Sequence, residues 1–106
     1  MLNSNHKREM LPDEKVKEAI SKLIHPAINL SLTELGIVQD IEIIDDTVIV
    51  TFVFPFPDIP IADKLIGMVT TQVEKMGLKL EYIVRVMKKE EKEAFLRMEK
   101  KAWKGL

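Results

Sequence analysis

The sequence predicts an α+β domain, a two-layer sandwich in which helices cover one face of a small, mostly antiparallel sheet. Three segments repeat apolar residues at helical spacing, and three others are rich in β-branched residues, alternating in part with polar ones in two of them and apolar on both faces in the third. Their order along the chain is helix, strand, strand, helix, strand, helix, which fits a two-layer packing. The chain has 106 residues, a typical size for one domain. We therefore expect a single domain over 12–106, after a polar, flexible tail at 1–11.

The first half of the domain is predicted to form a helix and then a hairpin. Apolar residues recur at helical spacing over Pro12–Ile24, and Pro26 cannot continue the helix. Ser31–Glu34 has the pattern of a capping box, which supports a single turn. Residues 37–44 alternate in part, and residues 47–54 are apolar or β-branched on both faces. The second of these segments is therefore the expected central strand, paired antiparallel with the first.

The second half is predicted to form a rigid loop, a helix, a strand and a last helix. Three prolines within Pro55–Pro60 exclude a strand there, and Pro60 suits the start of a helix. The apolar stripe of that helix stops before Gly77, a residue that commonly ends helices. Leu78–Met87 is the expected third strand. Residues 88–104 are the expected last helix, with seven basic and four acidic side chains.

The composition excludes several classes of function. The net charge is −1, with 16 basic and 17 acidic residues, so no general attraction to nucleic acid or anionic lipid is expected. No apolar run approaches the roughly 20 residues that span a bilayer, and we expect a cytoplasmic protein without a membrane partner. The chain has no cysteine, which excludes thiolate ligation of a metal. We therefore expect no cofactor, no metal site and no catalytic residue.

Three short segments carry a resemblance to a known family. His25-Pro26 follows the first helix, Leu35–Val38 opens the hairpin, and Pro57–Ala62 precedes the second helix. This pattern resembles the MIP18-like family, also called DUF59 or the iron–sulfur cluster assembly (FSCA) domain, over about Glu14–Val86. The resemblance implies a small, mostly antiparallel sheet covered by two helices. It also implies a role in the maturation of metal–sulfur proteins, usually through contacts with partner proteins.

The sequence departs from the family pattern at the positions that carry chemistry. The family's Asp and Glu correspond here to His25 and Ala27, and its Thr and Cys correspond to Phe56 and Ile59. Hydrocarbon thus replaces the thiol, and no other cysteine can take its place. The fold implied by the resemblance is unaffected, but a direct role in metal binding does not carry over. We expect a non-enzymatic adaptor or accessory factor that contacts other proteins, with metalloprotein-maturation factors as candidate partners.

The candidate binding residues are His25, Phe56, Asp58 and Ile59. Each of the two polar residues also has a structural interpretation. His25 is expected to hydrogen-bond a free carbonyl at the end of the first helix, and Asp58 is expected to cap the second helix. An alternative function is a small-molecule-binding domain or minor enzyme in which His25 and Asp58 share one pocket. The open edge of the sheet and the basic last helix are the two surfaces that could support a homodimer.

Overall fold

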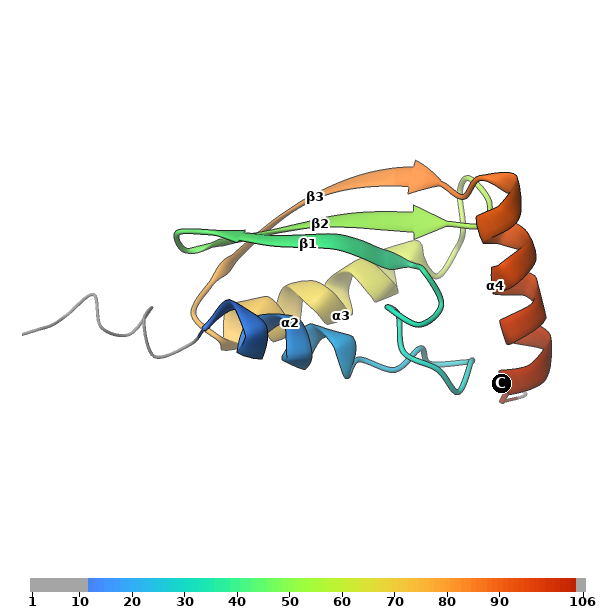
Figure 1. The fold of residues 1–106 in the computed structure, drawn as a ribbon, viewed down its shortest axis with the longest axis horizontal. Helices are drawn as coiled ribbons and strands as arrows, with labels where there is room; N and C mark the ends of the chain where they lie inside the picture. The colour runs from blue at the N-terminus through green and yellow to red at the C-terminus, as the bar shows by residue number, and fades with distance from the viewer. Residues whose placement is uncertain (1–11, 105–106) are drawn as a thin grey trace, which may run out of the picture.

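The computed structural model describes residues 12–104, and the predicted tail at 1–11 lies outside the described residues. It confirms the predicted order of elements. A three-stranded sheet has α2 and α3 packed beneath it, and α4 stands across one end (Figure 1). The helices are α2 (Asp13–Ser21), α3 (Ala62–Lys75) and α4 (Lys89–Ala102), and the strands are β1 (Val38–Ile44), β2 (Thr47–Phe54) and β3 (Lys79–Val86).

The core lies between the sheet and the two helices beneath it. Strand β2 is central, as predicted, and nearly all of its side chains are buried. Alternate residues of β2 point toward the helices, because successive side chains of a strand face opposite ways. The buried residues of α2 and α3 recur every three to four positions and meet these strand residues. The helical part of this core consists of Val16, Ile20, Leu65, Val69 and Val73.

The sheet is mixed, which differs from the mostly antiparallel sheet that we expected. Strands β1 and β2 form the predicted antiparallel hairpin, which turns at Asp45 and Asp46. Asp45 has a φ of 55°. Strands β2 and β3 are parallel. The chain crosses from the end of β2 back to the start of β3 through α3, and a crossover of that length joins parallel strands. Strand β3 thus forms one edge of the sheet and β1 forms the other.

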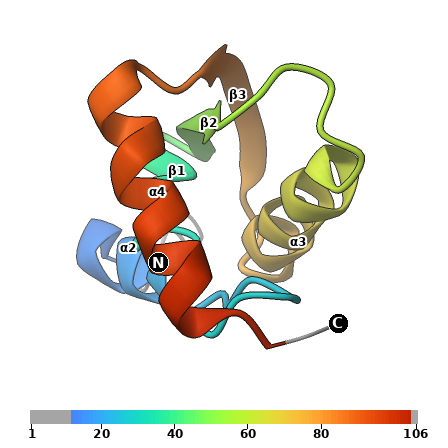
Figure 2. The same cartoon turned by 90° about the vertical axis from the view of Figure 1, so that its right-hand side faces the viewer.

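Helix α4 also differs from the expected arrangement, because it does not lie on the face that α2 and α3 cover. Figure 2 shows it crossing the end of the sheet at which β2 and β3 terminate. A polar cluster fixes its first turn. Glu91 accepts hydrogen bonds from both terminal nitrogens of Arg85 on β3, at 2.8 and 2.9 Å, and from the Gln39 side chain on β1 at 3.2 Å. It also accepts one from the Lys88 amide at 2.8 Å. These contacts join α4 to both edge strands.

Local signals in the sequence correspond closely to the observed boundaries. The Ser31 hydroxyl accepts a hydrogen bond from the Glu34 amide at 3.0 Å, and the Glu34 carboxylate accepts one from the Ser31 amide at 2.8 Å. This is the predicted capping box. Gly77 follows the end of α3 and has a φ of 78°, a left-handed backbone conformation that favours glycine. Helix α2 ends at Ser21, three residues earlier than predicted, because Ile24 pairs with Ser31 in an isolated bridge.

Within residues 12–104 no helix is both long enough and apolar enough to cross a membrane.

Candidate functional site

The loop that follows β2 forms one wall of the candidate site. It begins at Phe54, whose side chain is buried at the end of the central strand. The prolines at 55, 57 and 60 remove backbone donors and restrict the chain, so the loop leaves the sheet instead of extending it. Phe56 is 47% exposed, and Ile59 is partly buried against the core. The Lys92 ammonium of α4 lies 4.5 Å from the centre of the Phe56 ring, a cation–π contact at the edge of the site.

The segment after α2 forms the second wall and carries His25. The His25 amide donates to the Leu30 carbonyl at 3.0 Å, and its Nδ1 accepts from the Ala27 amide at 2.9 Å. The imidazole therefore stabilises the turn of its own loop. We had expected it to bond a carbonyl at the end of the preceding helix, and it does not. Since Nδ1 is an acceptor, we assign the proton of the neutral ring to Nε2. Only 6% of the residue is exposed.

The electrostatic surroundings of His25 favour the neutral ring. Burial lowers the pKa of His25 below its usual value, because removing the charged form from water is unfavourable. The positive charge of Lys104 lowers the pKa further. The ring therefore stays uncharged at neutral pH, with Nε2–H as its donor.

The end of α4 forms the third wall and is joined to the His25 loop by backbone pairing. The Asn29 amide donates to the Ala102 carbonyl at 2.8 Å, and the Lys104 amide donates to the Ala27 carbonyl at 2.9 Å. Trp103 pairs with Ile28 in an isolated antiparallel bridge, and its side chain is 51% exposed. The His25 loop and the end of α4 are thus held together, and with the loop after β2 they line one space, although the three segments lie far apart in the sequence.

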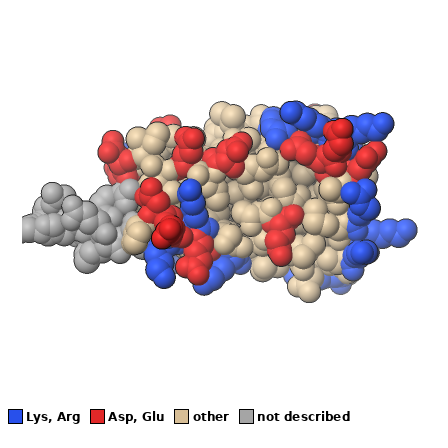
Figure 3. Space-filling model, viewed as in Figure 1, with Lys and Arg blue, Asp and Glu red and all other residues tan. Residues whose placement is uncertain are grey.

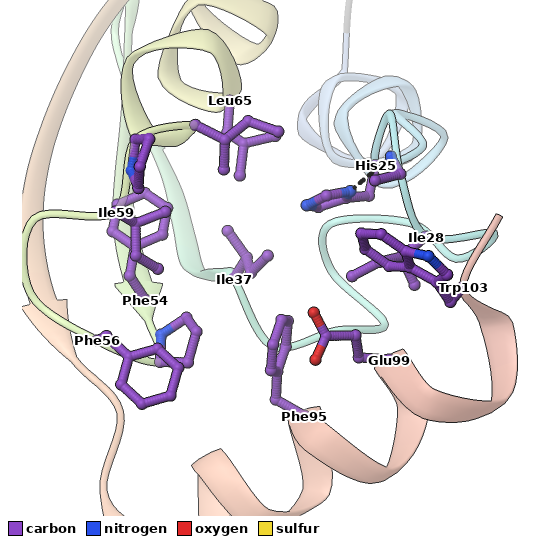
Figure 4. Close-up of a pocket in the computed structure, with 14 residues that line it drawn as sticks. His25, Ile28, Ile37, Phe54, Phe56, Ile59, Leu65, Phe95, Glu99 and Trp103 are labelled. Atoms are coloured by element: carbon purple, nitrogen blue, oxygen red, sulfur yellow. Dashed lines mark hydrogen bonds between the residues drawn. The ribbon is translucent and has the colours of Figure 1, made fainter. Parts of the chain in front are cut away.

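The space between these walls is a cavity of about 320 Å³. Its volume lies at the low end of the range for ligand pockets. Figure 4 shows the His25 ring and the Glu99 carboxylate directed toward it, among aromatic and aliphatic side chains. Among the described residues that line it, these two are the only ionisable side chains. The lining residues are His25, Ala27, Ile28, Ile37, Phe54, Pro55, Phe56, Ile59, Pro60, Ile61, Leu65, Phe95, Glu99 and Trp103.

Three of the four predicted binding residues meet at this cavity: His25, Phe56 and Ile59. Asp58 does not. It is exposed, has a φ of 57°, and borders a separate hollow on the other side of the loop, next to Arg85 of β3. Helix α3 begins after Ile61 without any side-chain cap, so the predicted capping role of Asp58 is wrong. His25 and Asp58 therefore do not share a pocket.

Sequence reasoning missed Glu99 and Phe95 as members of the site. The two lie four positions apart on α4, so they share one face of the helix. Phe95 is buried, and its neighbour on that face therefore points inward as well. The four-residue spacing of Phe95 and Glu99 in the sequence was enough to place them on one face of the helix. Only the position of α4 across the end of the sheet shows that this face borders the cavity.

The donor atoms of the cavity do not match those that hold an iron–sulfur cluster. Such clusters are ligated mainly by cysteine thiolates, and the chain has no cysteine. The cavity offers one imidazole and one carboxylate. Among residues 12–104 no three His, Asp or Glu side chains are grouped so that they could hold a metal ion. The site is chemically suited to contact apolar groups and to form a few directed hydrogen bonds.

The fold and the site together define a small α+β domain with an apolar cavity between a proline-rich loop and its last helix. Comparison with known families agrees: residues 13–81 match the family model described as "Iron-sulfur cluster assembly protein". Because this match covers more than half of the sequence, the chain belongs to that family, as the resemblance predicted.

Comparison with solved structures supports the fold. The structure is similar to the crystal structure of a domain of unknown function, DUF59, from Bacillus anthracis, with a TM-score of 0.57. The alignment covers 89% of this chain and 96% of that one, at 17% sequence identity. At this level of identity the likeness concerns the fold alone. A search of curated proteins found no match.

Proposed function

We propose that this protein is a non-enzymatic adaptor or accessory factor of iron–sulfur cluster assembly that works through contacts with other proteins. We place this activity in the cytoplasm. Membership of the family supports the pathway, and the chemistry of the cavity supports the mode of action. The observation that carries the proposal is that Ile59, at the position of the family's cysteine, lines an apolar cavity with half-exposed aromatic side chains around it.

The cavity has features that protein interfaces use. Aromatic residues are enriched where a few side chains supply most of the binding energy, and those residues usually fill or line a pocket from which water is excluded. Phe56 and Trp103 stand on either side of the cavity and are about half exposed. A partner that inserts an apolar side chain between them would cover both rings. The Nε2–H of His25 and the Glu99 carboxylate would then orient the partner through hydrogen bonds.

The alternative function, a ligand-binding domain or enzyme with His25 and Asp58 in one pocket, has less support. General acid–base catalysis requires both groups within hydrogen-bond reach of the same substrate. The two residues border different hollows, and the proline-rich loop separates them. The basic last helix gives little support to nucleic-acid binding, because acidic side chains lie among its basic ones (Figure 3).

The test is a binding assay with one disruptive variant and one matched control. Tagged protein is used to recover iron–sulfur maturation factors, and the affinity for a recovered factor is then measured. Phe56→Asp places a charge at the cavity and should weaken binding at least about tenfold. Leu96→Asp places the same charge on an exposed apolar residue of α4 that does not line the cavity, and it should bind as the unmodified protein does.

Three outcomes would overturn the proposal. The first is that no maturation factor is recovered, and the second is that Phe56→Asp binds as tightly as the Leu96→Asp control. The third is that purified protein retains iron tightly and loses it on replacement of His25 and Glu99. This third result would mean that the cavity itself binds metal through imidazole and carboxylate.

A further inference from the structure

One edge of the sheet is left open by the fold. Strand β3 pairs only with β2 among the described residues. At its two ends the Lys79 amide donates to the Asp46 carbonyl and the Met87 amide donates to the Phe54 carbonyl, both at 2.8 Å. In a parallel ladder the backbone groups of alternate residues point to the same side. The odd-numbered residues of β3 therefore bond to β2, and the even-numbered ones direct their N–H and C=O groups away from the sheet.

The side chains of β3 are unusually apolar for an open edge. Proteins commonly protect such edges with bulges, prolines or charged side chains that prevent pairing with another strand. Strand β1, at the opposite edge, has an irregular register between Gln39 and Glu42. Strand β3 is regular along its whole length and has no proline. Four of its apolar or aromatic side chains are 45–63% exposed: Tyr82, Ile83, Val84 and Val86.

We propose that β3 pairs antiparallel with β3 of a second copy of this chain, about a two-fold axis at Ile83. The two three-stranded sheets then become one continuous sheet. In this register Tyr82 lies opposite Val84 of the second copy, and both residues have outward-pointing backbone groups that can exchange hydrogen bonds. Ile83 faces its own symmetry mate. Glu81 lies opposite Arg85 of the second copy, and by symmetry the reverse pair forms as well.

Charge distinguishes this register from its two neighbours. The outward-pointing residues of one strand must face those of the other, so the axis has to pass through a residue, not between two. With the axis at Tyr82, Lys79 would face Arg85 of the second copy, and like charges directly opposite are unfavourable. With the axis at Val84, Ile83 would face Arg85. Of these three registers, only the axis at Ile83 pairs opposite charges, and it places Ile83, the most exposed apolar residue of the strand, against its symmetry mate.

The surroundings of the strand can accommodate this pairing. Arg85 already bonds to Glu91 through two nitrogens, but a guanidinium has five N–H donors and can also pair with Glu81 of the second copy. Beside the last residues of β3 lies a hollow of about 460 Å³ bordered by Val84 and Val86. Tyr82 of the second copy would lie next to Val84 on that side of the sheet.

The inference does not rest on the proposed function. No residue of β3 lines the cavity that contains His25. Failure of the dimer would leave the partner-binding proposal standing, and the reverse also holds.

The first test measures mass in solution by sedimentation over a range of concentrations. The full chain should approach twice its mass of 12.2 kDa as concentration rises. Ile83→Asp places two like charges at the axis and should leave the protein at 12.2 kDa. Ile44→Asp is the matched control, because Ile44 is 55% exposed on the other edge strand, and it should still dimerise. A full chain that is monomeric at every concentration, or a dimer lost only in Ile44→Asp, would overturn the proposal.

The second test identifies the register and does not depend on Ile83. Glu81→Arg and Arg85→Glu should each weaken the homodimer at least about tenfold, because each creates two like-charge pairs. A mixture of the two variants should recover a heterodimer in which both pairs are again attractive. Circular dichroism establishes that each variant is folded. If the mixture associates no better than the separate variants, Glu81 does not face Arg85 and the register is wrong.

A third test uses the absence of cysteine from the chain. Ile83→Cys should form a disulfide-linked dimer on mild oxidation, because residues opposite each other at a non-hydrogen-bonded position lie close enough for a disulfide. Ile44→Cys should stay largely monomeric under the same conditions. Equal cross-linking of the two variants would show that contact is random and would contradict the proposed axis.

Discussion

Stability near neutral pH should depend on the protonation of His25. The ring is buried, and its Nδ1 accepts the Ala27 amide, so protonation would both charge a buried group and remove that acceptor. Burial lowers the pKa of His25, with Lys104 contributing in the same direction. Well above pH 6.5 the ring is neutral in both the folded and unfolded states, and the free energy of unfolding does not depend on its protonation. As the pH falls below 6.5, the unfolded state binds the proton first and the folded protein loses stability.

The size of this effect has an upper limit set by one proton. A single group can change the free energy of unfolding by at most about 1.4 kcal/mol per pH unit. Between pH 7.5 and 5.5 the loss can therefore reach at most about 1.4 kcal/mol, the limit for an unfolded-state imidazole that takes up a proton while the folded one does not. Glu91, whose pKa is strongly lowered by its hydrogen bonds from Arg85, loses its contribution only in more acidic solution.

Urea unfolding at several pH values measures this effect. His25→Asn is the control, because an amide oxygen can accept the Ala27 hydrogen bond but does not titrate. Any contribution from His6 is present in both proteins and cancels in the difference. We expect the unmodified protein to lose stability between pH 7.5 and 5.5 and the variant to lose much less. Equal pH dependence in the two proteins, or a gain in stability of the unmodified protein on acidification, would refute the reasoning.

Four further substitutions test other parts of the structure. Phe95→Ala removes the buried anchor of α4 and should cost about 3 kcal/mol in thermal or urea unfolding; a loss below about 1 kcal/mol would mean that α4 packs weakly. Gly77→Ala has room for the added methyl group but retains a φ of 78°, so unfolding should show a loss of about 1–2 kcal/mol from backbone strain alone. Glu91→Gln removes the charge that Arg85 bonds, and hydrogen exchange should become faster in the first turn of α4 than in α3. Ile59→Cys introduces a single thiol into an apolar cavity, and its rate of alkylation against pH should give a pKa above about 8.5; a lower value would show that the site can still activate a thiol.

The parts of the fold that the sequence predicted correctly depend on interactions between near neighbours. The capping box joins Ser31 and Glu34, which are three residues apart, and its pattern is complete within four residues. The end of α3 at Gly77 reflects the conformational freedom of one residue. Strand β2 could be predicted as central because both of its faces are apolar, which only a strand covered on both sides requires.

The parts that were missed depend on where distant elements meet. Side-chain patterns do not specify whether β3 runs parallel or antiparallel to β2, since that follows from the path of the crossover. The place of α4 depends on contacts between Glu91 and residues of both edge strands. Glu99 enters the candidate site only because of that placement. Three of the four candidate residues were nevertheless predicted correctly as neighbours, because the resemblance to the family supplied long-range information that spacing lacks.

The loop that carries His25 shows how the site keeps its shape without the family's polar residues. The family pattern has Asp at this position, and an Asp side chain commonly accepts the backbone amide two residues later in a turn. Here Nδ1 of His25 accepts the Ala27 amide, which is also two residues later. The imidazole thus makes the bond expected of a carboxylate, but it adds no charge to the cavity at neutral pH. With hydrocarbon at Ile59 as well, this cavity is better suited to an apolar side chain of a partner than to a metal ion, and that difference is what the Phe56→Asp binding assay tests.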